Sequence, residues 1–126
     1  MSGYDLGPLP ANRRMTTIDE LMVAAPTVTM FGIARDVPLV LVNEPIFVAD
    51  GNNHLVRYNG FYPRWAYDEY RQFMLGWTAN GNHPWLDYWD ALPPADFTDP
   101  YFHRRASGER RLAGLLTAEL QGFGCP

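Results

Sequence analysis

Two short apolar runs along the chain have the pattern of buried strands. The run from Val37 to Val42 (VPLVLV) is almost continuously apolar and rich in β-branched residues, and Pro45 ends it. Continuous rather than alternating apolarity is typical of a strand that is covered on both faces, as in a parallel sheet. The segment PWLDYWD predicts a second short strand over about 84–88. Residues 45–62 are expected to form a long loop.

Apolar residues at spacings of three and four predict two amphipathic helices downstream of the first strand. One is expected over about 64–79, opened by Pro63 and closed by Asn80-Gly81. Its predicted buried stripe consists of Ala66, Tyr70, Phe73, Met74 and Trp77. The last helix is expected to begin near Ser107, whose hydroxyl would cap it. Its predicted apolar face consists of Leu112, Leu115, Leu116 and Leu120.

Helical signals also precede the first strand. In TIDE, Thr17 occupies an N-cap position and Glu20 follows three residues later, which is the pattern of a capping box. A helix is therefore predicted over about 18–25. Pro26 suits the first turn of a second helical piece over about 26–35.

The order of these elements predicts one α/β domain over residues 16–122, with a flexible arm at 1–15 and a tail at 123–126. Strands that alternate with helices form parallel sheets through right-handed crossovers. A small α+β domain is the alternative. Two strands leave open sheet edges, so either a third strand lies in the arm or the long loop, or a second copy of the chain completes the layer. We therefore expect a homodimer.

Composition and charge narrow the classes of partner. The 126 residues include 14 acids and 10 bases, and the net charge of −4 argues against binding to nucleic acids or anionic membranes. Every base is Arg, which excludes lysine chemistry. The single cysteine, Cys125, cannot form an internal disulfide, and no apolar run reaches the roughly 18 residues that a membrane span needs. We expect a soluble cytoplasmic protein that uses no cofactor.

Polar residues follow both predicted strands. Asn43 and Glu44 end the first strand, and the loop after the second carries Asp99 and His103. Ligands of open parallel sheets gather beyond the carboxyl ends of the strands, so these four residues are expected to converge. A carboxylate beside an imidazole fixes its tautomer and leaves the other ring nitrogen to take a proton from a nucleophile. The alternative is that Asp99 caps a turn and His103 bonds a backbone carbonyl.

The segment FTDPYFHRRASGERRLAGLLTAEL, residues 97–120, resembles the last block of the SGNH (GDSL-type) hydrolases. In that block an Asp and a His precede a small-residue stretch and a Leu-rich C-terminal helix. PLVLVNEPIF, RYNGFYPRWAYDEYRQF and WLDYWDALP also resemble upstream segments of these proteins, so the likeness covers about residues 30–122. It implies the C-terminal half of an SGNH or flavodoxin-like fold, with His103 as general base and Asp99 as its orienting acid. The spacing of four between them differs from the three of many family members.

The resemblance also implies groups that this sequence lacks. The family needs a nucleophilic Ser in a Gly-Asp-Ser block, and oxyanion donors from a Gly and an Asn in two intermediate blocks. Only Ser2 and Ser107 are present, and no G-x-S-x-G occurs. We therefore expect an SGNH-like binding or interaction module without hydrolase activity of its own. The alternatives are an ester hydrolase whose nucleophile comes from another chain, and an unrelated α+β domain that binds a small molecule.

The other candidate residues point to binding rather than catalysis. The aromatic-rich stretch from Tyr58 to Tyr70 is a candidate wall of a small-molecule pocket or an interface, with core packing as the alternative for its Trp65. The candidate ligand-binding residues are Asn43, Glu44, Arg57, Tyr58, Arg64 and Trp65. The three histidines lack a metal-ligand spacing, so no metal site is predicted. The arginines at 104, 105, 110 and 111 are expected to form a solvated helix face.

Overall fold

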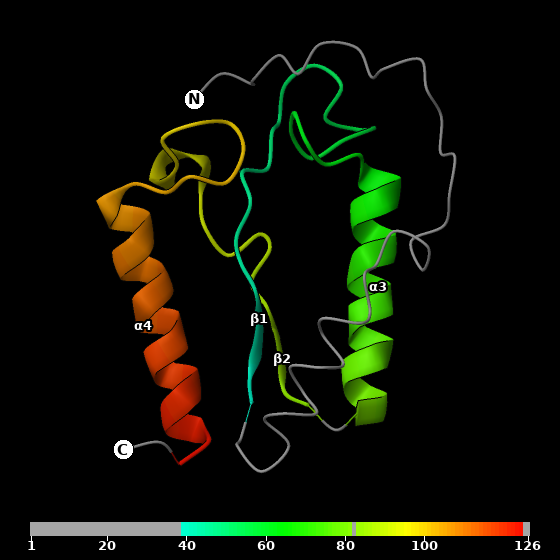
Figure 1. Cartoon of the computed structure of the whole chain (residues 1–126). Coiled ribbons are helices and arrows are strands. Elements are labelled where there is room, and N and C mark those ends of the chain that lie inside the picture. The colour runs from blue at the N-terminus through cyan, green and yellow to red at the C-terminus, as the bar shows by residue number, and fades with distance from the viewer. Residues whose placement is uncertain (1–38, 82, 125–126) are drawn as a thin grey trace.

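The computed structural model describes residues 39–81 and 83–124, so the predicted arm and the predicted N-terminal helices lie outside the described residues. The elements follow in the order β1 (Leu41–Asn43), α3 (Arg64–Gly81), β2 (Trp85–Asp87), the 3-10 helix η1 (Pro94–Asp96) and α4 (Ala106–Gly122), as Figure 1 shows. β1 and β2 form a parallel two-stranded sheet, and α3 connects them. The described part is thus a small mixed domain with a parallel sheet and two helices, as expected.

The two strands are short, but the segments that follow them stay paired. Asn43 lies opposite Asp87 in the sheet, and the N–H of Ile46 donates to the carbonyl of Trp89 at 2.9 Å. The predicted strand at about 84–88 is confirmed. The predicted first strand overlaps β1 at its carboxyl end, and residues 37–38 lie outside the described residues. In the described residues, the loop 45–62 contains no third strand.

Helix α3 has the expected position, but the centre of its buried face differs from the predicted stripe. Tyr67, Met74 and Thr78 are its buried residues, whereas most of the predicted stripe is half-buried. Thr78 is tolerated there because its hydroxyl donates to the carbonyl of Met74 at 2.7 Å. Helix α3 does not meet the length and hydropathy of a membrane-spanning helix, nor does any other helix in the described ranges.

Helix α4 begins one residue before Ser107, and the predicted cap is wrong. Arg105 occupies the N-cap without a side-chain hydrogen bond, and Ser107 lies inside the first turn. The Ser107 hydroxyl donates instead to Asp96 Oδ1 at 2.7 Å, because η1 lies against the start of the helix. Gly108 is buried at this contact, and a Cβ there would lie 2.7 Å from the carbonyl oxygen of Asp96. Of the predicted leucine face, Leu112 is buried and Leu120 is 38% exposed.

The sheet lies between the two helices. In Figure 1, α3 covers one side of β1 and β2 and α4 lies on the other, while the loops that follow the strands gather at one end. Two small clusters form the core at that end. One contains Phe47, Ala49, Leu92 and Phe97, and the other contains Ile46, Tyr58 and Tyr67.

Asn59 joins the loops at the carboxyl ends of the strands. It is fully buried, and its amide nitrogen donates to the carbonyls of Phe47 at 2.9 Å and Tyr101 at 3.2 Å. Its amide oxygen accepts the N–H groups of Phe61 at 2.9 Å and Tyr62 at 3.2 Å. One side chain therefore holds both of the long loops that surround the candidate site.

Candidate functional site

Asp99 and His103 form a hydrogen-bonded pair in the loop between η1 and α4. His103 Nδ1 contacts Asp99 Oδ2 directly. The base of this loop is closed by backbone bonds, from Thr98 N–H to the carbonyl of His103 at 2.8 Å and from Arg105 N–H to the carbonyl of Asp96 at 2.7 Å. The pairing expected from the sequence is therefore present, and it sits on a loop that is tied at both ends.

The second carboxylate oxygen of Asp99 shapes the turn. Asp99 Oδ1 accepts the N–H groups of Tyr101 at 3.0 Å, Phe102 at 3.2 Å and His103 at 3.3 Å. Partial burial alone would raise the pKa of Asp99, but the bonds from the His103 ring and from the Tyr101 and His103 backbone outweigh it and lower that pKa. Asp99 thus both caps the turn and orients the imidazole, so the two sequence interpretations of Asp99 hold together.

The His103 ring is accessible. Its side chain is 66% exposed, and it lies against Phe102 with ring centroids 4.5 Å apart. When Nδ1–H donates to Asp99, the neutral ring presents Nε2 as its proton acceptor. No residue in the ranges 39–81 and 83–124 forms a hydrogen bond with Nε2. The geometry therefore suits proton transfer to or from a group outside the described residues.

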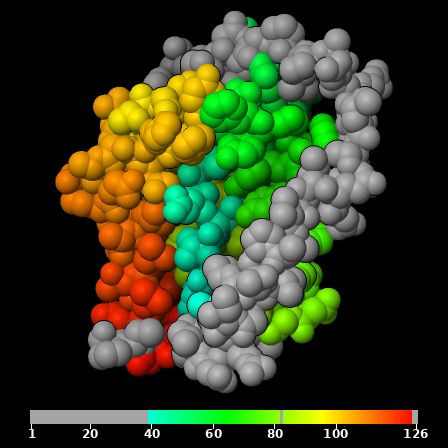
Figure 2. All heavy atoms as spheres, viewed as in Figure 1, coloured from blue at the N-terminus to red at the C-terminus, as the bar shows by residue number. Residues whose placement is uncertain are grey.

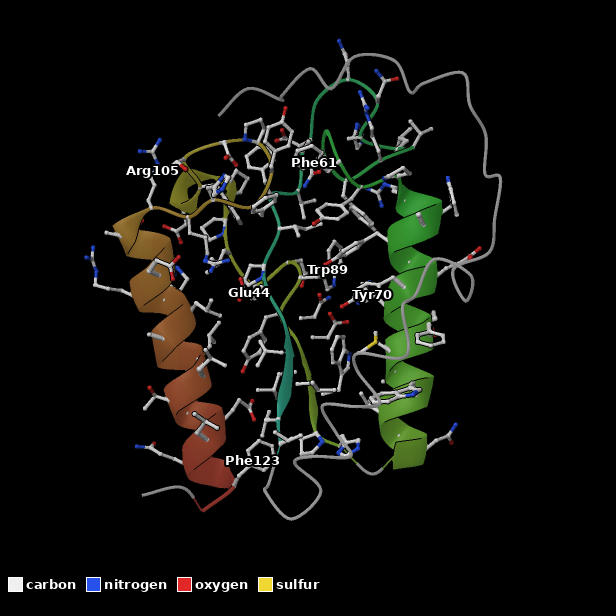
Figure 3. All side chains as sticks on the ribbon, in the orientation of Figure 1. Glu44, Phe61, Tyr70, Trp89, Arg105 and Phe123 are labelled. Carbon is white, nitrogen blue, oxygen red and sulfur yellow. The ribbon has the colours of Figure 1, made fainter. Side chains whose placement is uncertain are left out.

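A pocket of about 490 Å³ reaches the loop of this pair through Phe102, which forms part of its wall, whereas Asp99 and His103 do not line it. It is bounded by the residues after β1, the end of the loop 45–62 and the first half of α3. Five of its lining residues are aromatic: Phe61, Tyr62, Tyr67, Tyr70 and Phe102. In Figure 3, Tyr70 extends from α3 toward the strands, and Phe61 lies in the loop at the carboxyl ends of the strands. On the face drawn in Figure 2, the cyan segment of β1 reaches the surface between the yellow-orange loop and the green segment.

Asn43 provides the polar part of the pocket. It is 7% exposed, and its amide nitrogen donates to Asp87 Oδ1 at 2.8 Å. Its amide oxygen accepts from the hydroxyl of Tyr67 at 3.3 Å and, at the limit of 3.5 Å, from that of Tyr70. Burial raises the pKa of both tyrosines, so both hydroxyls remain neutral. Arg71 in turn donates to Asp87 Oδ2 at 2.9 Å, which leaves this half-buried carboxylate paired.

Glu44 reaches the loop of the Asp/His pair through an ion pair. Arg104 Nη1 lies 3.0 Å from Glu44 Oε2, and Arg104 Nε lies 3.0 Å from Glu109 Oε1. Asn43 and Glu44 both line the pocket that Phe102 also lines. The structure therefore brings Asn43 and Glu44 together at the pocket, whereas Asp99 and His103 do not line it and contact neither of them; the link to their loop is the Glu44–Arg104 ion pair.

Of the remaining candidate ligand-binding residues, Arg57, Tyr58 and Arg64 serve packing in this structure, and Trp65 does not. Arg57 and Tyr58 are 6% and 4% exposed, and the guanidinium of Arg64 lies 4.3 Å from the centre of the Tyr58 ring. Arg64 Nε also donates to the carbonyl of His54 at 2.6 Å. Trp65 is 38% exposed, so it is not a core residue. The lining of the pocket includes none of these candidates.

The aromatic pocket residues were only partly foreseen. The stretch from Tyr58 to Tyr70 was a candidate wall, and it contributes Phe61, Tyr62, Tyr67 and Tyr70. Phe102 was missed because a single aromatic residue in a loop has no periodicity to mark it. Its position directly before His103 is the signal that could have identified it.

The described residues contain no obvious nucleophile or metal cluster. Ser107, the serine within them, donates to Asp96, and Ser2 and Cys125 lie outside them. No group of three His, Cys, Asp or Glu side chains in these residues could hold a metal ion. Comparisons of the chain with protein-family models, curated proteins and solved structures gave no match.

Proposed function

We propose that this chain carries the acid–base half of an SGNH-type ester hydrolase site and does not hydrolyse esters by itself. The observation that supports this most directly is the contact between His103 Nδ1 and Asp99 Oδ2, with the ring exposed beside an apolar pocket. This is the arrangement that a general base and its orienting acid need. The resemblance of residues 97–120 to the last SGNH block agrees with it.

In this proposal each residue has one role. His103 Nε2 takes the proton from the hydroxyl of a nucleophile as that hydroxyl attacks the ester carbonyl. The imidazolium then gives this proton to the departing oxygen as the ester C–O bond breaks, so the alcohol leaves neutral and the acyl group stays on the nucleophile. Asp99 holds the ring orientation and stabilises the imidazolium that forms. The pocket binds the apolar part of the ester and so holds its carbonyl near His103.

The nucleophile is proposed to come from another chain. Ser107 is unsuitable because its hydroxyl already donates to the buried carboxylate of Asp96. The known cost of removing a triad member is large, so the chain alone should leave esters intact. A homodimer is part of this proposal, because β1 pairs only with β2 among the described residues and a second copy could extend the sheet.

A second candidate function is a small-molecule-binding module without catalysis. The pocket favours it, because its volume of about 490 Å³ lies within the usual range for ligand sites and its lining is largely apolar. In this case the Asp99/His103 pair serves only the loop. An unrelated α+β binding domain would have the same properties.

The first test asks whether the chain contains its own nucleophile. The purified protein is treated with a fluorophosphonate serine probe, and its intact mass and ester turnover are measured. We expect neither an adduct nor turnover. A stoichiometric adduct on Ser2 or Ser107 would show that the nucleophile is present and would overturn this part of the proposal.

The second test separates the acid–base site from the plain binding module. Transfer of the acetyl group from p-nitrophenyl acetate to an added small alcohol, trifluoroethanol, is followed by the amount of trifluoroethyl acetate. A general base at His103 should accelerate this transfer, and His103→Gln should abolish the acceleration. His54→Gln is the matched control, because His54 lies in the turn of the loop 45–62, where its ring Nδ1 contacts the carbonyl of Gly51 at 2.7 Å. Equal rates of acetyl transfer for the unmodified chain, His103→Gln and His54→Gln would overturn the acid–base site and leave the binding module as the function.

A further inference from the structure

The rings at the mouth of the pocket share nearly one orientation. Phe61 stacks on Tyr101 with centroids 4.3 Å apart and planes 29° apart. The planes of Phe61 and Phe102 differ by 31°, at a centroid distance of 6.0 Å. Phe61 and Phe102 line the pocket, whereas Tyr101 does not, so Tyr101 supports Phe61 from behind. The pocket thus has one wall of flat rings held in place by a stacked neighbour.

These two lining rings are unusually accessible for aromatic residues. Phe61 is 58% exposed and Phe102 is 40% exposed. Both belong to loops whose backbones Asn59 and Asp99 hold by several hydrogen bonds. An apolar surface that is exposed yet rigid is suited to binding a ligand, because its side chains lose little conformational entropy on binding.

The α3 side of the pocket is also aromatic, but its tyrosine rings carry hydroxyl groups. Tyr67 and Tyr70 stand on the same side of α3, with ring centroids 5.7 Å apart, and both hydroxyls point to Asn43. Among the described residues that line the pocket, Glu44 is the sole charged one, and it forms an ion pair with Arg104. No cationic side chain in that lining would bind a carboxylate or phosphate inside the pocket.

We propose that this pocket binds a neutral, flat aromatic ring between the Phe61/Phe102 wall and the Tyr67/Tyr70 wall. Aromatic rings prefer offset-stacked and edge-to-face partners, and both walls offer them. A volume of about 490 Å³ is large enough for one ring and its substituent. If the function proposed above holds, the substrate class is therefore an ester with an aryl or arylmethyl group; this second step rests on that function.

The experiment compares two neutral esters that differ only in whether their six-membered ring is flat and aromatic or puckered and saturated, benzyl acetate and cyclohexylmethyl acetate. Their binding to the full chain is measured by NMR titration of the Phe and Tyr ring signals and of the His103 Cε1–H signal. We expect benzyl acetate to bind roughly three- to tenfold more tightly, because aromatic pairing adds to the burial of area that both share. Phe61→Leu and Phe102→Leu should each remove most of this preference.

Phe123→Leu is the matched control. Phe123 is 47% exposed and lies at the far end of α4 from Arg105 in Figure 3, away from the pocket. It should leave both affinities unchanged. Phe61 and Phe102 are also exposed, so their replacement by Leu should preserve the fold; a thermal unfolding curve for each variant checks this.

The outcomes separate this inference from the proposed function. Equal binding of the two esters, or binding of neither, would overturn the ring-binding site even if His103 still acted as a base. A preference for benzyl acetate that persists in His103→Gln would support the ring-binding site without reference to catalysis. Ring binding without any shift of the His103 Cε1–H signal would support the site and count against the proposed function.

Discussion

Arg104 connects Glu44, at the end of β1, to the loop that holds His103. Its Nη1 lies 3.0 Å from Glu44 Oε2, across 60 positions of sequence. A second contact, from Nε to Glu109 at 3.0 Å, anchors the same guanidinium to the first turn of α4. The Asp99/His103 loop is therefore fixed from two elements by the residue that follows His103.

We expect Glu44→Gln to cost at most about 1 kcal/mol of unfolding free energy, because Glu44 is well exposed. Arg104→Gln should cost more, because its side chain is 13% exposed and it loses both partners. Urea unfolding measures both. Glu119→Gln, on the exposed end of α4, is the control and should change little. An Arg104→Gln protein as stable as this control would contradict the anchoring role.

The Asp99 contact should set the tautomer of His103. At a pH where the ring is neutral, the Nδ1-protonated form is expected, because Oδ2 of Asp99 accepts that proton. Long-range proton–nitrogen NMR correlations distinguish the two tautomers. Asp99→Asn keeps an amide oxygen for the turn but loses the charge, and it should shift the ring toward the Nε2-protonated form. An unchanged tautomer ratio would show that Asp99 does not orient the ring.

Replacement of two glycines in α4 by Ala should change the free energy of unfolding in opposite directions. Gly108→Ala places a methyl group 2.7 Å from the Asp96 carbonyl, so η1 and α4 must separate; we expect a loss of about 1–3 kcal/mol. Gly114→Ala meets no atom within 4 Å and should gain roughly 0.5–1 kcal/mol from helix propensity. Denaturant midpoints measure both changes. A tolerated Gly108→Ala would mean that the packing of η1 on α4 is loose.

The Ser107–Asp96 contact should make stability depend on acid pH. The hydrogen bond from Ser107, followed by that from Arg111, holds the pKa of Asp96 below its ordinary value of 3.8, although burial opposes this. A depressed carboxyl pKa stabilises the fold fully above the ordinary value, and this stability is lost as the pH falls through the folded-state pKa.

Ser107→Ala should therefore lose stability at neutral pH and show a smaller further loss on acidification. Unfolding curves at pH 7 and at pH values below 4 measure both effects. Thr117→Ala is the control, because Thr117 donates its hydroxyl to Ala113 within the same helix and touches no carboxylate in the described residues. Parallel acid profiles for the two variants would exclude the role of Ser107.

Light scattering after size exclusion tests the proposed dimer. The sheet of the described residues has two strands, so a second copy is expected to cover an edge and give a mass of twice 14.3 kDa. The dimer should dissociate on dilution. A stable monomer at all concentrations would exclude the proposed association.

Local patterns in the sequence were sufficient to predict α3, α4 and the two parallel strands of the described residues. The buried face of α3 differs from the predicted apolar stripe because it includes Thr78, whose hydroxyl donates to a carbonyl of the same helix. A hydrophobicity pattern does not record such a bond. The cap at Ser107 failed because its partner, Asp96, lies 11 positions away and meets it only through tertiary packing. The Asp99/His103 pair was predictable because its members are only four positions apart in the sequence. The pocket required the spatial meeting of Phe61 and Phe102, which local patterns do not contain.

The four hydrogen bonds of the buried Asn59 amide have a consequence for local unfolding. They reach Phe47 and Tyr101 on one side and Phe61 and Tyr62 on the other. The bond to Tyr101 joins the His103 loop to the loop 45–62, so separation of the two loops breaks it and costs the amide one of its buried partners. The aromatic wall and the His103 loop should therefore open as one cooperative unit, and their backbone amides should exchange with deuterated water at matched rates.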